Sequence, residues 1–330
     1  MRIDVHNHAV PEQAIELLNR DPVYGVTVTN GRWRGSVPPE FDLLESFTDP
    51  EAKVAELEGN ELEGAVVSTS PTLFYYHLDA EPAEAMARAV NAGLAEIAAA
   101  RADRLSWMAT VPLQAPERAA AVLDDAVGAG CVGVEIATAA GPQQPLDDPP
   151  LEPFWAAAER HGLPVMLHPM YTVAHPRLGD YYLENVIGFP FETTIAIERL
   201  ICSGLLDRHP GLRVVLAHAG GYFPWQAGRL RHARTVRPEL ESSPADPWSY
   251  LGQVLVDPIT HDADALRYLI AKVGAANVVM GTDLPFDMAT PEPMTALLAA
   301  CDEETATLIA ERNPADLYGR VTAPTTEGSP

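Results

Sequence analysis

The sequence predicts a (β/α)8 barrel, a fold in which eight parallel strands alternate with eight helices. Short apolar runs rich in β-branched residues recur along the chain, and amphipathic segments separate most of them. Several runs are apolar at nearly every position, as in Val214–Leu216 and Val278–Met280, which is typical of parallel strands buried on both faces. An open, doubly wound sheet is the alternative, but no Gly-x-Gly-x-x-Gly turn follows the first apolar run.

The expected strands and helices alternate from the first residue to about residue 311. Strands are expected at Arg2–Val5, Gly64–Ser68, Leu105–Thr110, Val132–Ile136, Pro164–Leu167, Arg213–Ala217, Gln253–Asp257 and Asn277–Gly281. Helices are expected at Pro50–Gly59, Pro82–Ala102, Ala115–Ala129, Leu151–His161, Glu192–Arg208, Tyr222–Arg237, Asp262–Val273 and Pro291–Glu311. This alternation in a chain of 330 residues fits a closed barrel.

One long excursion, from Ala9 to Thr48, interrupts the alternation after the first strand. Within it, residues 26–34 form two alternating runs on either side of Asn30-Gly31, which predicts a small β-hairpin. We expect this insertion to cover the barrel mouth. Residues 1–320 are expected to form one domain that includes the insertion at 9–48, and the tail at 321–330 is expected to be disordered.

The charge and the cysteine pattern exclude several classes of function. Acidic residues (46) outnumber basic ones (22), and the net charge of −24 disfavours nucleic acid and anionic membranes as partners. Three dispersed cysteines give neither a disulfide framework nor a thiolate zinc motif. No signal peptide is recognisable, and no apolar stretch reaches the roughly 18 residues that a membrane span needs. We therefore expect a cytoplasmic protein.

Histidines and one aspartate follow four of the predicted strands. The first strand runs into His6 and His8, which point to the same face because they are two residues apart in an extended chain. The fifth strand is followed by His168, the sixth by His218 and the eighth by Asp283. In a (β/α)8 barrel the carboxyl ends of the strands meet at one rim, which carries the catalytic residues. These five side chains are therefore expected to converge.

Three imidazole nitrogens and one carboxylate oxygen suit a divalent transition metal. We predict that His6, His8, His168 and Asp283 bind zinc, with manganese as the second choice. A metal at such a site lowers the pKa of bound water toward neutrality. His218 is then expected to be the acid/base group beside that water, without binding the metal itself.

Seven short segments carry a resemblance to a known family. They are Arg2–His8, Pro112–Glu117, Glu192–Ile197, His218–Gly221, Phe223-Pro224, Gly228-Arg229 and Gly281–Phe286. Together they resemble the amidohydrolase superfamily, and within it aminocarboxymuconate semialdehyde decarboxylase and its relatives, from Met1 to about Gly319. The resemblance implies a distorted barrel with one zinc at the predicted ligands, His218 as the base, and no organic cofactor. It also implies non-oxidative loss of CO2 from a small unsaturated or aromatic carboxylic acid.

The same resemblance implies substrate-binding arginines and a homodimer. Arg229 is expected to reach into the site of the neighbouring subunit, where its guanidinium suits bidentate binding of the substrate carboxylate. The family has a second arginine just after a short hairpin, and here Arg34 is the nearest candidate and Arg32 the next. Met170 stands where the family has an aromatic residue after His168-Pro169.

Two other functions stay open at this point. Glu135 lies near the end of the fourth strand, where some amidohydrolases carry a carboxylate that bridges two metals. A binuclear site of that kind would favour hydrolysis of a lactone or an amide, and hydration of a double bond is a related alternative. The third possibility is a metal-binding protein without catalytic activity on the same fold.

Overall fold

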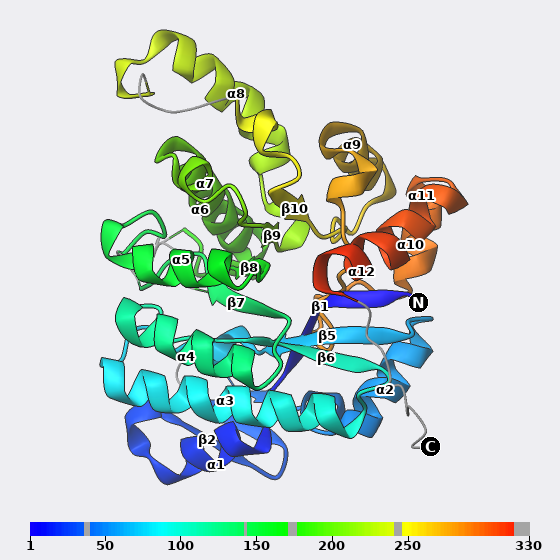
Figure 1. The fold of residues 1–330 in the computed structure, drawn as a ribbon. Coiled ribbons are helices and arrows are strands. Elements are labelled where there is room, and N and C mark those ends of the chain that lie inside the picture. The colour runs from blue at the N-terminus through cyan, green and yellow to red at the C-terminus, as the bar shows by residue number, and fades with distance from the viewer. Residues whose placement is uncertain (36–39, 142–143, 171–176, 241–245, 320–330) are drawn as a thin grey trace, which may run out of the picture.

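A curved sheet of seven parallel strands lies at the centre of the computed structural model, with helices around its outside (Figure 1). The structure describes residues 1–330 except 36–39, 142–143, 171–176, 241–245 and 320–330, so the predicted tail at 321–330 lies outside the described residues. The strands pair in parallel in the order β1-β5-β6-β7-β8-β9-β10. Their bounds are Ile3–Ala9 (β1), Gly64–Thr69 (β5), Leu105–Ala109 (β6), Gly133–Ala137 (β7), Val165–His168 (β8), Val214–Leu216 (β9) and Val254–Val256 (β10). The predicted barrel class and its first seven strands are confirmed.

Residues 278–284 close the barrel between β10 and β1, where the sequence predicts an eighth strand at Asn277–Gly281. No regular ladder forms there, so that strand is a wrong prediction. The contacts include two isolated bridges, Val256–Val278 and Asn7–Leu284, and five backbone hydrogen bonds of 2.8–3.3 Å, one to β10 and four to β1. The segment forms no regular ladder because its backbone turns at Asp283, which has φ 69°.

Helices cover the outer face of the sheet, and most follow the predicted pattern. Their bounds are Glu12–Arg20 (α1), Pro50–Gly59 (α2), Ala80–Ala100 (α3), Pro116–Gly128 (α4), Glu152–Arg160 (α5), Phe189–Cys202 (α6), Leu205–Arg208 (α7), Phe223–Val236 (α8), Ala263–Val273 (α9), Pro293–Ala300 (α10), Glu303–Thr307 (α11) and Asn313–Tyr318 (α12). The helix predicted at 192–208 is two helices, because Gly204 adopts φ 72° between them. The helix predicted at 291–311 is interrupted at Cys301, where the backbone is extended. In the described part of the chain, no helix has the length and apolar character to cross a membrane.

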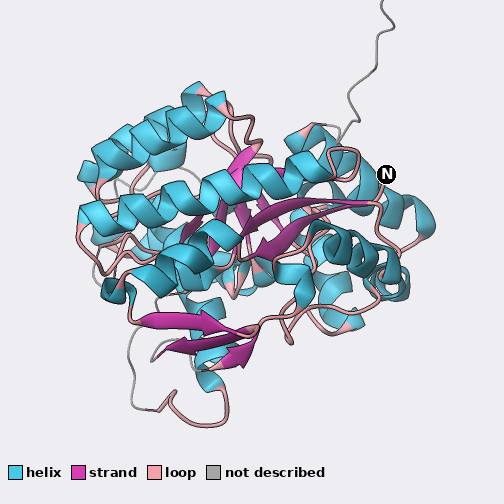
Figure 2. Cartoon of the chain, turned by 90° about the horizontal axis from the view of Figure 1, so that it is seen from below, coloured by secondary structure: helices cyan, strands magenta, loops and turns pink. Residues whose placement is uncertain are grey.

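The insertion after β1 contains the predicted hairpin together with elements that the sequence did not predict. Strands β2 (Val26–Thr29), β3 (Arg32–Gly35) and β4 (Phe41–Asp42) form a separate antiparallel sheet, visible away from the barrel strands in Figure 2. Asn30 and Gly31 have φ 53° and 68°, as a type I′ hairpin turn requires. Helix α1 and strand β4 are the elements of the insertion that the sequence did not predict.

A series of aromatic rings connects this small sheet to the rim of the barrel. Trp33 is fully buried, and its ring lies 5.5 Å from that of Phe41. The ring of Phe41 is 6.4 Å from that of Phe47, which is 5.2 Å from Phe286. Phe286 in turn lies 5.2 Å from the ring of His8. The insertion therefore packs against the end of the barrel that carries the histidines, and its covering of the barrel mouth stays a prediction.

Apolar side chains fill the amino-terminal part of the barrel interior. The buried cluster there includes Val5, Val66, Met108, Met166, Val215, Val279, Leu317 and Tyr318. Tyr318 of α12 lies against Gly133, the first residue of β7, so α12 closes this end. The polar side chains of the barrel consequently gather at the carboxyl ends of the strands, where this fold carries its active sites.

Candidate metal centre

The four predicted metal ligands meet at the carboxyl ends of the barrel strands. His6 and His8 belong to β1, His168 ends β8, and Asp283 lies in the closing segment. One ligand atom of each residue lies within 4.8 Å of all the others, and all four residues are buried. Oδ1 of Asp283 is 3.3, 2.9 and 3.8 Å from Nε2 of His6, His8 and His168. The fold thus brings together the residues that the sequence pattern singled out.

Each of the three imidazoles is oriented by a hydrogen bond at its other ring nitrogen. The partners of Nδ1 are Oδ2 of Asp257 for His6 (2.8 Å), the carbonyl oxygen of Thr69 for His8 (2.8 Å) and the carbonyl oxygen of Pro169 for His168 (3.0 Å). Because carboxylate and carbonyl oxygens accept, Nδ1 donates in each ring, and in the neutral ring Nε2 carries the lone pair. Metal-binding histidines are oriented in this way.

The chemistry of the donor set fits a divalent cation. Nε2 of His6 and Nε2 of His168 are buried and have no hydrogen-bond partner among the described residues. Buried nitrogens without a partner are costly, and a cation between them and Asp283 would satisfy them. Three imidazole nitrogens with one carboxylate oxygen are a usual set for zinc and related transition ions.

The electrostatics of the cluster also favour a positive charge at its centre. Burial raises the pKa of Asp283, but His6, His168 and His218 outweigh it and hold this pKa well below its usual range. Burial disfavours the charged form of His6, yet Asp283 and a second carboxylate raise its pKa to about 10. Burial lowers the pKa of His8 and of His168. Asp283 is therefore ionised, while His8 and His168 offer neutral imidazoles.

The turn that presents Asp283 is fixed by Asp4, a buried residue of β1. Thr282 donates to Asp4 through its N–H at 3.1 Å and through its hydroxyl at 2.5 Å. Nδ2 of Asn7 donates to the same carboxylate at 2.8 Å. Burial raises the pKa of Asp4 to about 6, and the hydrogen bonds act in the opposite direction. This support holds Asp283 at φ 69°, a region that residues other than glycine rarely adopt.

His218 stands beside the ligand cluster at the start of the turn after β9. Its Nε2 is 3.5 Å from Oδ2 of Asp283, and its ring is 5.1 Å from that of His168. Its side chain is 18% exposed, whereas those of His6 and His8 are fully buried. Among these imidazoles His218 is thus the one that is open to a molecule entering the barrel mouth.

Two aspartates of this centre were missed by sequence reasoning. Asp257 ends the predicted strand at Gln253–Asp257 and is fully buried, and Asp4 lies within β1. Asp257 accepts from Nδ1 of His6 and from the N–H of His218, both at 2.8 Å. An aspartate at the end of an apolar strand, on the same rim as the histidines, is the signal that could have identified Asp257.

Glu135 of β7 points into the barrel but away from the ligand atoms. Its side chain is fully buried, and its Oε1 is 3.9 Å from Nδ1 of His8, the nitrogen on the far side of that ring from Asp283. Burial raises the pKa of Glu135 to about 8. Within the described residues, the ligand atoms that meet come from four residues and Glu135 is not one of them. Glu135 therefore lies outside the cluster of four ligand atoms, and a single metal ion stays a prediction.

The predicted substrate arginines are not brought to the cluster within this single chain. Arg34 is exposed on β3, and its Nη1 donates to the hydroxyl of Thr29 at 2.9 Å. Arg32 is also exposed and pairs with Glu40 at 3.3 Å. Arg229 is exposed on α8, the helix that projects from the barrel at the top of Figure 1. Their roles in substrate binding stay predictions.

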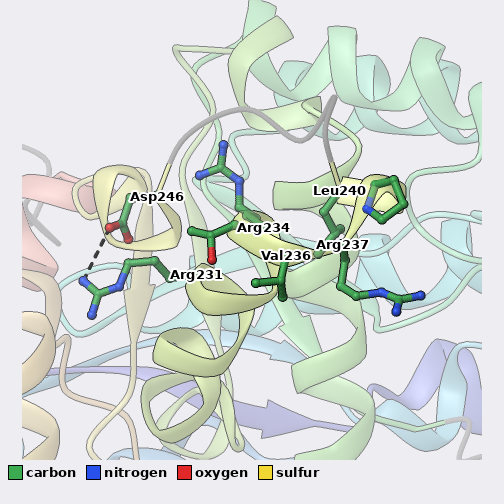
Figure 3. Close-up of a pocket in the computed structure, with 8 residues that line it drawn as sticks. Arg231, Arg234, Val236, Arg237, Leu240 and Asp246 are labelled. Carbon is green, nitrogen blue, oxygen red and sulfur yellow. Dashed lines mark ion pairs between the residues drawn. The ribbon is translucent and has the colours of Figure 1, made fainter.

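A cavity of about 490 Å³ lies at the end of α8 (Figure 3). Its charged lining residues are Arg231, Arg234, Arg237 and Asp246. Arg231 pairs with Asp246 at 3.5 Å, and Arg237 pairs with Glu239 at 2.5 Å. None of the predicted site residues lines this cavity, so we do not regard it as the active site.

Comparison with known proteins identifies the class. The amidohydrolase family model matches residues 3–320, and the chain belongs to this family. It is 30% identical over 298 residues to 2-amino-3-carboxymuconate-6-semialdehyde decarboxylase of Dictyostelium discoideum, covering 87% of this chain and 82% of that protein. It is 32% identical over 258 residues to gamma-resorcylate decarboxylase of Rhodococcus jostii, covering 70% and 75%. The apo crystal structure of Metarhizium anisopliae IDCase superposes with a TM-score of 0.85 at 26% identity, covering 96% of this chain and 97% of that chain.

Proposed function

We propose that this protein is a metal-dependent, non-oxidative decarboxylase of a small unsaturated or aromatic carboxylic acid. The observation that carries the proposal is the buried cluster of His6, His8, His168 and Asp283, with the partly exposed His218 3.5 Å from Asp283. Two relatives whose names state decarboxylation support this reaction. Zinc is the proposed ion and manganese the alternative, because the donor set suits both. The proposal includes no organic cofactor.

The side chains around the cluster have distinct roles in this reaction. A bound metal ion would supply Lewis-acid polarisation of the substrate oxygen atoms. His218 acts as the general acid and carries a proton on Nε2, which lies 3.5 Å from Oδ2 of Asp283. His218 then donates that proton from Nε2 to the carbon that bears the carboxylate, and a C–H bond forms with a π electron pair of the substrate. The C–C bond to the carboxylate breaks, its electron pair returns to the π system, and CO2 leaves.

A second copy of the chain is proposed to complete the substrate site. Arg229 is exposed on the projecting helix α8, which also exposes Trp225 (47%) and Val236 (60%). In a homodimer, Arg229 of one subunit would bind the substrate carboxylate in the site of the other through its two parallel N–H groups. Arg34 is the proposed second arginine, with Arg32 as its alternative.

Mixed dimers test whether Arg229 acts across the interface. Arg229→Ala and His218→Ala are each expected to be inactive as pure proteins. Subunit exchange between them creates hybrids in which one site has both residues intact, if Arg229 comes from the partner. An equal mixture should then regain about a quarter of wild-type activity, because about half of the dimers are hybrids with one working site of two. Verified hybrids without activity would contradict the arrangement.

Release of CO2 tests the reaction itself. The substrate panel begins with the acids named for the two relatives, 2-amino-3-carboxymuconate-6-semialdehyde and gamma-resorcylate. Metal-loaded wild-type protein should release CO2 in equal amount to the acid consumed, and His218→Ala should lose about 10²–10⁴-fold in rate. Product without CO2 would instead favour hydrolysis of a lactone or amide, or hydration, which the names of the relatives do not support. Metal-loaded protein that is inert toward every acid and ester would revive the non-catalytic alternative.

A further inference from the structure

Asp257, directly after β10, connects the two halves of the proposed site. Its side chain is fully buried. Oδ2 accepts from Nδ1 of His6 and from the N–H of His218, both at 2.8 Å. Oδ1 accepts from the N–H of Ala219 at 2.7 Å and from the N–H of Ile259 at 3.1 Å. These donors use the full acceptor capacity of a carboxylate, so one side chain holds both a ligand imidazole and the backbone that carries the acid/base group.

The turn that carries His218 needs support because of its backbone conformation. His218 and Ala219 have φ 55° and 58°, in the left-handed region that residues other than glycine rarely adopt. Such conformations persist where the surrounding structure holds them in place. The N–H groups of these same two residues donate to Asp257, and the ring of His218 lies 5.5 Å from that of His6. Asp257 is therefore the anchor of this turn.

We propose that Asp257 is a positioning residue that sets the tautomer of His6 and the place of His218 together. By accepting from Nδ1 of His6, it directs the lone pair of Nε2 toward Asp283 and the other ligands. By accepting from two N–H groups of the turn, it fixes the position of the His218 ring relative to the same ligands. The inference rests on the proposed function for the roles of His6 and His218, while Asp257 itself binds neither metal nor substrate.

Asp257→Asn removes this arrangement with little change in shape. The amide has one oxygen and one NH2 group, and an NH2 group cannot accept a hydrogen bond from another donor. In one orientation it faces His6 and His218, and in the other it faces Ala219 and Ile259. Two donors therefore lose their acceptor whichever way the amide turns.

The matched control is Asp262→Asn, the same substitution at the start of α9. Asp262 accepts from the N–H of Ala265 at 2.8 Å as the helix N-cap and has no part in the metal centre. Asparagine caps helices about as well as aspartate. This control variant should bind metal as the wild-type protein does.

Two readouts report on the site without any substrate. Competition with a chromophoric chelator should show Asp257→Asn binding zinc about 10–100-fold more weakly than wild type. The visible spectrum of the cobalt-substituted protein should change in Asp257→Asn and stay as in wild type for Asp262→Asn. On an acid that is decarboxylated, Asp257→Asn should lower kcat with little change in KM. Wild-type zinc affinity and an unchanged cobalt spectrum in folded Asp257→Asn would overturn the proposal, whatever reaction the protein catalyses.

A measurement on the wild-type protein keeps the test decisive if Asp257→Asn does not fold. The zinc-loaded protein, labelled with ¹⁵N-histidine, can be studied by nuclear magnetic resonance to find the protonated nitrogen of each ring. The proposal requires a slowly exchanging proton on Nδ1 of His6, because that nitrogen is buried and donates to Asp257. A proton-free Nδ1 at His6 would contradict it.

Discussion

Gly281→Ala tests how closely the closing segment must approach β1 beside the metal centre. A Cβ atom added at Gly281 would lie 2.7 Å from Cβ of His6 and 3.0 Å from Cβ of Asp257. Carbon atoms in contact prefer about 3.5–4.0 Å, so the methyl group would be about 1 Å too close to His6. Both neighbours are fully buried and Cβ is the least mobile part of a side chain, so the backbone has to move.

We expect Gly281→Ala to lower the free energy of unfolding by about 1–3 kcal/mol, the usual cost of overpacking. Zinc affinity should fall as well, because Nε2 of His6 moves with its Cβ. Gly128→Ala is the control, since a Cβ added at this end of α4 meets open space. That variant should be neutral or stabilising by up to about 1 kcal/mol, with unchanged zinc affinity.

Urea unfolding measures the stability of both variants, and chelator competition measures their zinc affinity. A Gly281→Ala protein with wild-type stability and wild-type zinc affinity would refute the reasoning. The closing segment would then have room to shift without moving His6, and the close approach at Gly281 would not matter for the metal centre.

Three further outcomes are expected. Burial raises the pKa of the Cys131 thiol to about 11, so about one thiol in a thousand is ionised at pH 8. Iodoacetamide should therefore label Cys131 only after the protein unfolds. Rapid labelling of Cys131 in the native protein, detected by peptide mapping, would contradict this. Nζ of the buried Lys53 donates to the carbonyl oxygen of His8 at 2.8 Å. Lys53→Met leaves that oxygen without its donor and should lower the free energy of unfolding by about 1–3 kcal/mol. A urea midpoint equal to that of wild type would argue against this prediction. When free zinc is present at 100 times its Kd, its removal should lower the free energy of unfolding by about 2.7 kcal/mol. The thermal unfolding of an Asp283→Ala protein should not depend on zinc in this way.

The barrel strands could be predicted because burial on both faces makes them continuous apolar runs. The eighth run, Val278–Met280, is as apolar as the strand at Val214–Leu216, yet it forms no ladder because the chain turns at Asp283 soon after it. That turn depends on Asp4, a contact between the two ends of the chain that no local pattern reveals. Helix α1 could have been found, since its buried residues Ala14, Ile15, Leu17 and Leu18 repeat at helical spacing.

The metal ligands could be predicted because each lies in or directly after an apolar run of the barrel. The place of Asp257 on the same rim could also have been predicted, but its contact with His6 could not, because an aspartate at a strand end serves equally well as a cap or a turn residue. The direction in which the arginines of the hairpin point depended on which residues of β3 face the buried side. Trp33 faces the buried side, so its neighbours Arg32 and Arg34 point to the opposite face, toward solvent.

Anomalous diffraction from crystals of the zinc-loaded protein can locate the ion among its proposed ligands. We predict one zinc per chain, bound by Nε2 of His6, His8 and His168 and by the carboxylate of Asp283, with His218 close by but not coordinated. A second zinc beside Glu135, or an ion that is coordinated by His218 in place of one of the four ligands, would contradict the proposed metal centre and the acid/base role that depends on it.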